Sequence, residues 1–243
     1  MIMSWCKEKT FVNVDENFRL IEKRKSIRRE HFMNGIDGKF RLTVFVTITA
    51  LVLLVGCHRK DQKPLACMER AVFGDPSQSA YILPYPVGAS YRLMQGYCYS
   101  EGGHRNQLAY DFKTPIGTQV IAAHSGLVMK IRSDLPDDGK QPDSGQHNHI
   151  MIKHDDGTVA FYAHLKQDSI LVSVGNRVSQ GQPIASSGNS GNTQGLPHLH
   201  FGVYEGWPAK EGFDVPVNFR NAEGIHDQRK GLKPGGYFKA LPF

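Results

Sequence analysis

The sequence has little of what marks several common protein classes. Four cysteines occur among 243 residues, with no Cys-x-x-Cys pair, which argues against a zinc site built from cysteines. No long stretch repeats its apolar residues with clean helical periodicity, so a helical domain is not expected. The glycine-rich segment 187–195 lacks the lysine of a phosphate-binding loop and any following helix signal, which weakens a nucleotide-binding interpretation.

The longest apolar run, residues 42–56, is shorter than the roughly 20 residues that a membrane-spanning helix needs. It suits the core of a secretory signal instead. The Leu-Val-Gly-Cys segment 54–57 resembles a bacterial lipobox, so Cys57 is predicted to carry a diacylglyceryl anchor. His58 follows it rather than the aspartate associated with inner-membrane retention, which favours the outer membrane. We therefore expect a lipid-anchored envelope protein on the periplasmic side.

The region before the apolar run is long and charged for a signal peptide. A start at Met33 would leave a short, mildly basic leader, and the alternative is a genuine cytoplasmic extension. In either case residues 1–56 are predicted to be leader and signal peptide. Residues 57–80 are predicted to be the lipidated cysteine and a charged, turn-rich tether.

Charge argues against a nucleic-acid-binding protein. The whole chain has 29 Lys and Arg against 23 Asp and Glu, a formal charge of +6. Residues 1–56 hold ten basic and six acidic residues, so 19 against 17, or +2, remain for residues 57–243. A mature domain that close to neutral lacks the basic footprint of nucleic-acid binding, and nothing in the sequence implies an oligomer.

From residue 81 the sequence has the short alternating segments and turn residues of β structure. The fold class is predicted to be mainly β, an antiparallel domain of two sheets or one folded sheet. Strands are expected at 90–94, 119–123, 127–131, 150–154, 158–165, 170–178 and 182–185. Beyond residue 206, segment 214–219 is expected to add an edge strand, and the rest of the extension 206–243 to pack loosely.

The chemistry of the chain centres on the His-Leu-His segment 198–200. Alternate residues of a strand point to one face, so His198 and His200 are expected to converge on one cleft. A hydrolytic zinc site needs three protein ligands and one open position, so further groups must come from elsewhere. Upstream, His104 and Asp111 are separated by six residues, and His164 lies in an alternating apolar run.

Together these landmarks resemble the lysostaphin-type, or LytM-like, zinc endopeptidases of bacterial cell walls. In sequence order they are His104, Asp111, Gly-Thr-Gln-Val-Ile-Ala-Ala at 117–123 with Gly126, Tyr-Ala-His-Leu at 162–165, Gly-Asn-Ser-Gly at 188–191 and Pro-His-Leu-His-Phe at 197–201. The resemblance covers residues 81–205. It departs from the usual pattern where six residues, rather than three, separate His104 from Asp111, which bears on the loop geometry more than on the ligands.

The resemblance implies one zinc ion per chain, in a groove between loops, held by His104, Asp111 and His200. It implies that His164 and His198 stay unligated, one as a proton acceptor and the other as a stabiliser of the oxyanion. The expected activity is metal-assisted hydrolysis of peptide bonds in the stems or cross-bridges of peptidoglycan, without a covalent intermediate. Peptidoglycan is thus the expected partner, beside the membrane that holds the Cys57 anchor.

Two other functions remain open. A non-catalytic module of the same fold could bind wall material or activate another hydrolase, although degenerate relatives typically lack metal ligands and here all five positions are filled. A lipid-tethered zinc carrier fits the number of histidines but not the framework around them.

Several further residues are assigned from the sequence. Cys67 and Cys98 either pair in an oxidising envelope compartment or remain free thiols. The polar side chains of the 187–195 loop that could bind substrate carbonyls are those of Asn189, Ser190 and Asn192. The remaining histidines are expected to pack or to be solvated: His147, His149 and His154 flank a strand, with a supporting role at the cleft rim open for His149, whereas His124 and His226 are expected to be solvated.

Overall fold

The structure is a computed structural model that describes residues 66–140, 145–210 and 212–243. The predicted leader 1–56, the alternative start at Met33 and the predicted lipidation site Cys57 lie outside the described residues. Within the described part of the chain, no helix has the length and apolar character needed to cross a membrane.

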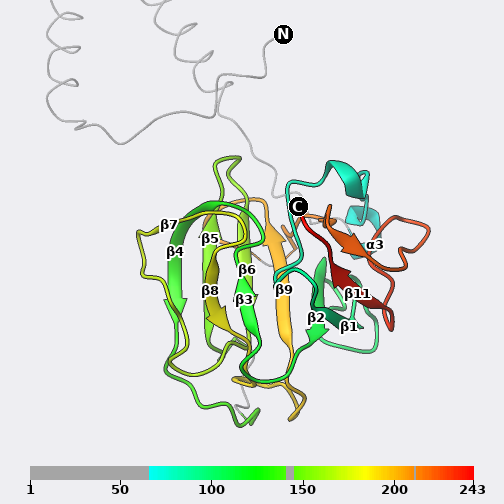
Figure 1. Ribbon diagram of the computed structural model, residues 1–243. Helices are drawn as coiled ribbons and strands as arrows, with labels where there is room; N and C mark the ends of the chain where they lie inside the picture. The colour runs from blue at the N-terminus through cyan, green and yellow to red at the C-terminus, as the bar shows by residue number, and fades with distance from the viewer. Residues whose placement is uncertain (1–65, 141–144, 211) are drawn as a thin grey trace, which may run out of the picture. The chain divides into compact units, whose positions relative to one another are not determined.

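The described residues form a nine-stranded antiparallel sheet and a two-stranded sheet (Figure 1). The large sheet has the strand order β10-β11-β1-β2-β9-β6-β5-β4-β7. Its strands are β1 Ser90–Gln95, β2 Ala109–Lys113, β4 Gly126–Arg132, β5 His149–Lys153, β6 Val159–Ala163, β7 Arg177–Val178, β9 Leu199–Tyr204, β10 Ala222–Glu223 and β11 Tyr237–Ala240. The small sheet pairs β3 Gln119–Ile121 with β8 Pro183–Ser186, and the helical elements are α3 Cys67–Arg70 and the 3-10 turn η1 Pro76–Gln78.

The core lies on one face of the large sheet, because apolar residues alternate along its central strands. In β9, Leu199, Phe201 and Val203 are buried in this core, which leaves His200 on the opposite face. The small sheet lies against the core face (Figure 1), and Ile184 of β8 belongs to the same buried cluster. The two layers are also joined by a hydrogen bond of 2.8 Å from the Ala123 N–H to the Tyr162 hydroxyl.

The mainly antiparallel β fold is confirmed, and most predicted strands occur within a few residues of their expected positions. Two segments differ. Residues 170–174 form no strand, and the strand expected there is reduced to β7. The edge strand expected at 214–219 is also absent, and only an isolated bridge joins Asp214 to Tyr204. Pro216 removes a backbone donor inside that segment, which disfavours a longer ladder.

The expectation that the C-terminal extension packs loosely is wrong. Strand β11 pairs with β1, and β10 pairs with β11, so residues after 206 extend the large sheet. Phe219, Leu232 and Phe238 are each at most 1% exposed. The Tyr85 hydroxyl donates to the Phe238 carbonyl at 2.8 Å. The extension is therefore a structural part of the domain.

The segment before β1 also belongs to the folded unit, in contrast to the predicted tether through residue 80. Cys67, Ala71 and Phe73 are buried, and Cys67 is joined to Cys98 by a disulfide with a Cα–Cα distance of 5.6 Å. Of the two alternatives for these cysteines, the structure has the bonded one. Residues 66–80 are therefore part of the folded domain and do not form a free tether.

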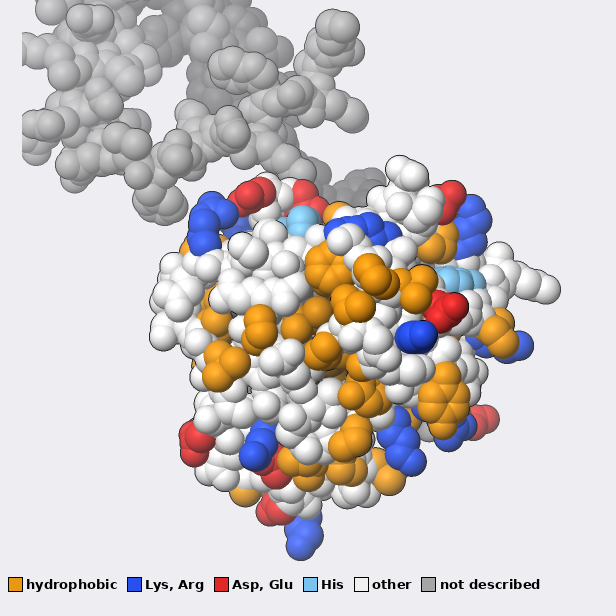
Figure 2. Space-filling view, viewed as in Figure 1, with side chains coloured by type: hydrophobic (Ala, Val, Ile, Leu, Met, Phe, Trp, Pro, Cys, Tyr) orange, Lys and Arg blue, Asp and Glu red, His pale blue; other side chains and the backbone are white. Residues whose placement is uncertain are grey.

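Figure 2 shows the same side of the molecule with its side chains coloured by type. Apolar side chains are exposed across the middle of this face, and lysine and arginine side chains are interspersed with acidic ones, mostly towards the rim. This mixed distribution agrees with the charge of +2 for residues 57–243.

Candidate metal centre

Two neighbouring strands place Asp111 and His200 opposite each other. Strands β2 and β9 are antiparallel, and their register pairs Asp111 directly with His200. Both side chains leave the sheet on the face away from the core, because their neighbours Tyr110, Phe112 and Phe201 occupy the core face. Asp111 Oδ1 lies 2.9 Å from His200 Nδ1.

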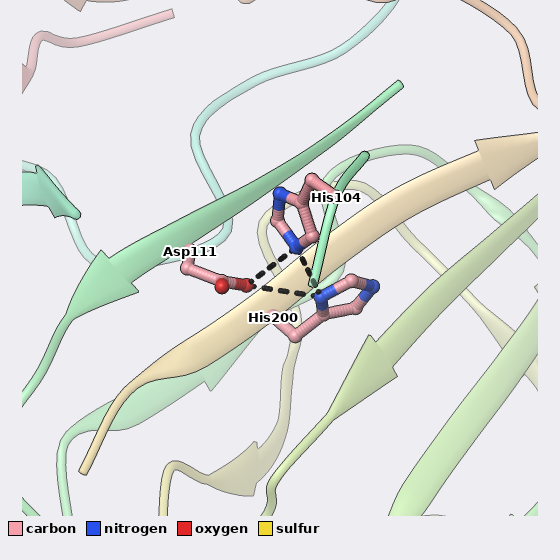
Figure 3. Close-up of side chains that lie close together, drawn as sticks. All are labelled: His104, Asp111 and His200. Atoms are coloured by element: carbon pink, nitrogen blue, oxygen red, sulfur yellow. Dashed lines mark hydrogen bonds and ion pairs between the residues drawn. The ribbon is translucent and has the colours of Figure 1, made fainter. Parts of the chain in front are cut away.

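His104 reaches this pair from the loop between β1 and β2 (Figure 3). Its Nδ1 atom lies 3.1 Å from the Gly96 carbonyl oxygen, which can only accept, so Nδ1 carries the proton. The other ring nitrogen, Nε2, then has its lone pair directed at the pair on the strands. It lies 3.1 Å from His200 Nδ1 and 3.1 Å from Asp111 Oδ1.

The three donor atoms fit a zinc ion. They form a nearly equilateral triangle with sides of 2.9 to 3.1 Å. Donors bound tetrahedrally to zinc at about 2.0–2.2 Å lie roughly 3.3 Å from one another, so little movement is needed. Two imidazoles and one carboxylate form a ligand set that zinc accepts, with a fourth position left open. Among the described residues, this is the one group of three such side chains close enough to share an ion.

The electrostatics of the site favour a cation. Burial raises the pKa of Asp111, but the neighbouring His104 and His200 outweigh it and hold that pKa well below its usual value. Burial likewise opposes protonation of His104, while the Asp111 carboxylate raises the His104 pKa above its ordinary value. An ionised carboxylate that is 3% exposed needs a positive partner, and a bound metal ion would provide one.

His164 and His198 lie next to the triad, and each directs its Nδ1 atom at a backbone carbonyl. Their ring centroids are 4.5 Å apart. His164 Nδ1 donates to the Ser190 carbonyl and His198 Nδ1 donates to the Leu196 carbonyl, each at 2.7 Å. Each Nε2 atom therefore keeps an available lone pair, and that of His198 lies 3.8 Å from Asp111 Oδ2.

His164 has two unusual properties. Burial, reinforced by His198 and His200, lowers its pKa to about 3, so the ring is neutral. Its backbone has a φ of +58°, a left-handed conformation that non-glycine residues seldom adopt. Such a conformation persists only where the surrounding structure imposes it, as happens at many functional sites.

The expected substrate contacts in the 187–195 loop are only partly compatible with the structure. Ser190 is fully buried, and its hydroxyl accepts from the Asn148 N–H at 3.0 Å and donates to the Leu165 carbonyl at 2.7 Å. Its side chain thus has an internal role, and its carbonyl orients His164. Asn189 is 7% exposed and accepts from the Thr193 hydroxyl. Asn192 is exposed and stays a predicted substrate contact.

Sequence reasoning missed the residues that hold this loop. Asn148 donates from its side-chain nitrogen to the carbonyls of Leu135 and Leu165, at 2.8 and 3.2 Å. Asp137 accepts from the Asn189 N–H and the Gln167 N–H, each at 3.0 Å. These partners lie far apart in the sequence, and no spacing or motif identifies them.

The other histidines are mostly packed. His149 is buried against Phe161, with ring centroids 5.6 Å apart, and burial lowers its pKa. His147 lies beside His164, with ring centroids 5.3 Å apart, and burial lowers its pKa to about 2. His124, expected to be solvated, stacks on buried His154 at 4.7 Å. His226, also expected to be solvated, is partly buried.

Comparisons with known proteins agree with this site. Residues 105–214 match the family model for Peptidase family M23, a segment that begins directly after His104 and includes the other four site residues. The chain is 40% identical over 91 residues to the peptidoglycan DD-endopeptidase ShyA of Vibrio cholerae, a match that covers 37% of this chain and 18% of ShyA.

A second relative is the uncharacterized lipoprotein YgeR of Escherichia coli, 31% identical over 112 residues, which are 46% of this chain and 39% of YgeR. The chain thus covers less than half of the length of either of these relatives. Among solved structures, lysostaphin from Staphylococcus simulans is 28% identical with a TM-score of 0.41, covering 51% of this chain and 47% of that one. On the match of residues 105–214, this segment is assigned to peptidase family M23, as its resemblance to the LytM-like enzymes predicts.

Proposed function

We propose that the chain is a zinc-dependent endopeptidase that hydrolyses peptide bonds in the stems or cross-bridges of peptidoglycan. The observation that carries the proposal is the convergence of His104, Asp111 and His200 on one point, with His164 and His198 beside it. The family match supports a peptidase, and the names of relatives such as ShyA support peptidoglycan as the substrate.

His104, Asp111 and His200 would hold the ion through Nε2, Oδ1 and Nδ1. When bound, zinc supplies the Lewis acidity that makes a coordinated water nucleophilic near neutral pH. The protein contributes rigidity, because two of the three ligands lie on paired strands. The Gly96 carbonyl fixes the proton on Nδ1 of the third ligand, His104, so that its other nitrogen faces the ion.

His164 and His198 would move the protons. Because both rings donate from Nδ1 to a backbone carbonyl, both present Nε2 to the space beside the metal ligands. One Nε2 would accept a proton from the attacking water and then pass that proton to the nitrogen of the leaving amine. The other, after taking up a proton from solvent, would donate a hydrogen bond to the oxyanion of the peptide carbonyl.

We also propose that the protein works in the cell envelope, attached through a lipid on Cys57. The Leu-Val-Gly-Cys segment supports the anchor, and YgeR is named a lipoprotein. A further relative, 33% identical over 112 residues, is named the outer membrane antigenic lipoprotein B of Histophilus somni. Its name agrees with the outer-membrane location that His58 predicts for this chain. Labelling with a radioactive fatty acid, lost in Cys57→Ala, tests the anchor.

The test of the activity is digestion of purified sacculi by the purified chain, with mass spectrometry of the released fragments. We expect new amino termini from peptide-bond cleavage, which disappear with a zinc chelator and in His164→Ala. His124→Ala is a control, because His124 lies outside the metal centre and packs on His154. Zinc-loaded chain that binds sacculi but releases no peptide would instead support the non-catalytic module.

A further inference from the structure

His104, the third proposed metal ligand, lies in a loop, whereas the other two ligands lie on paired strands. We define the His104 loop as residues 96–108, between β1 and β2. From 97 to 107, all of them described, His104 is the only buried residue. Tyr97 and Cys98, at the start of the loop, pack against the core, but the part around His104 has little apolar packing, whereas Asp111 and His200 are fixed by a strand pair. The position of His104 must depend on other links.

Within the loop, a few polar contacts hold His104 in place. The Cys98 N–H donates to the Gln107 carbonyl at 2.8 Å, which closes the loop at its base. The Gln107 N–H donates to the His104 carbonyl at 3.1 Å. These bonds are partly open to water, so by themselves they give the loop little resistance to opening.

Helix α3 clamps both ends of this loop from outside. At the beginning of the loop, Cys98 is covalently bonded to Cys67. Near its end, the Arg70 guanidinium donates to the Asn106 carbonyl at 2.8 Å and pairs with the buried Asp214. The Asp214 carboxylate in turn accepts from the Leu108 N–H. A helix of four residues has no stability of its own, so the clamp works because the disulfide and the Arg70 contacts attach it to the domain.

The backbone at Cys98 gives a second, independent sign of constraint. Its φ is +51°, in the left-handed region that a residue with a side chain adopts only at an energetic cost. Such a conformation is kept when the surroundings over-determine it. The disulfide and the bond to Gln107 both hold this residue.

We propose that Cys67 and Cys98 are positioning residues for metal binding: their disulfide keeps the His104 loop in the conformation that directs His104 at Asp111 and His200. The inference rests on the proposed function only in taking these three residues as the zinc ligands. Without the bond, the strand-borne pair stays in place while the His104 loop samples open conformations. Zinc then has to order the loop on binding, which weakens its affinity.

The experiment compares the full chain with Cys67→Ala/Cys98→Ala, which leaves no free thiol at either position. Zinc affinity is measured by competition with a chromophoric chelator. Hydrogen–deuterium exchange of the zinc-free proteins is followed over residues 96–108. Ile184→Ala is the matched control, because Ile184 is fully buried in β8 and its loss destabilises the domain away from the loop.

We expect zinc to bind the double variant about 10–100-fold more weakly, the range seen when supports of a metal ligand are removed. Exchange should accelerate in the His104 loop and stay unchanged in β2 and β9. An unchanged zinc affinity in the double variant, or an equal loss in Ile184→Ala, would overturn the proposal. If the double variant does not fold, Cys67→Ser/Cys98→Ser replaces it, because it also breaks the disulfide and keeps side chains of similar size, and the same two outcomes then decide.

The outcome for the unaltered chain separates this inference from the proposed function. If the chain binds zinc but digests no sacculi, the proposed peptidase function is overturned. The comparison of zinc affinities still decides the role of the disulfide. If the chain binds no zinc, both proposals are overturned.

Discussion

Asp111 and His200 face each other across neighbouring strands, with Asp111 Oδ1 2.9 Å from His200 Nδ1, although the two residues are 89 positions apart in the sequence. The proposed third ligand, His104, comes from a loop. The centre thus combines a rigid pair with one ligand whose position depends on its own supports. This division shapes how substitutions at the site should behave.

Substitution of His200 in β9 and of His198, which lies just before this strand, should separate metal binding from turnover. His200→Ala removes a proposed ligand, so zinc content and activity should fall together. His198→Ala should keep zinc and lower kcat by about 10²–10⁴-fold, the usual contribution of a group that transfers protons. Elemental analysis and sacculus digestion measure the two quantities. Equal loss of zinc in both variants would show that these two roles are wrongly assigned.

Zinc should stabilise the fold independently of catalysis. An ion that binds only the folded state adds about 2.7 kcal/mol at 100 times its dissociation constant, which raises Tm by roughly 5–10 °C in a domain of this size. Calorimetry with and without zinc measures the shift. His104→Ala should reduce it strongly, and His226→Ala, outside the site, should leave it unchanged. A shift that persists in His104→Ala would place the ion elsewhere.

The C-terminal strand should be needed for stability. Phe238 of β11 is fully buried in the core, so Phe238→Ala should lower the free energy of unfolding by about 3–5 kcal/mol. Tyr237→Ala is the control, because the neighbouring Tyr237 is 66% exposed and points away from the core. Denaturant unfolding of both variants gives the comparison. Similar small effects for the two would mean that the C-terminal segment packs as loosely as its sequence suggested.

His154 should make stability depend on pH. Burial lowers its pKa below the ordinary 6.5, aided by His124 and opposed by Asp156 and Asp155. Below pH 6.5 the unfolded chain therefore binds a proton that the folded chain does not. The free energy of unfolding should fall by up to about 1.4 kcal/mol per pH unit from this residue, until the lower folded pKa is reached.

His154→Asn tests that origin, because asparagine can still donate to the Ser125 carbonyl that His154 Nδ1 contacts at 2.7 Å. Urea unfolding between pH 5 and 7.5 should give a shallower dependence in the variant than in the unaltered chain. Identical slopes would assign the pH dependence to other groups.

The sequence predicted the site better than the elements around it. His198 and His200 fall on one face because side chains alternate in a strand, a rule that needs no tertiary information. That Asp111 lies opposite His200 could not be derived in the same way, since strand register depends on contacts between distant segments. The resemblance to LytM-like enzymes grouped these residues with His104, and the structure brings the same three residues together.

The errors have a common physical cause. Strand β11 is four residues long and lies in a glycine- and lysine-rich context, and it becomes a strand only because β1 offers it a free edge. Ser190 was expected to contact the substrate. It is buried because Asn148 and Leu165, remote in the sequence, supply both of its hydrogen bonds. Such partners are determined by the fold and cannot be predicted from local composition.

The pairing of β2 with β9 has a consequence for the order of assembly. The segment between these strands contains β3 to β8, so the two donor atoms meet only when a pairing between distant parts of the chain has formed. Before this ladder forms, Asp111 and His200 are far apart and cannot bind the same ion. An ion that needs all three proposed ligands would therefore bind only after this ladder has formed.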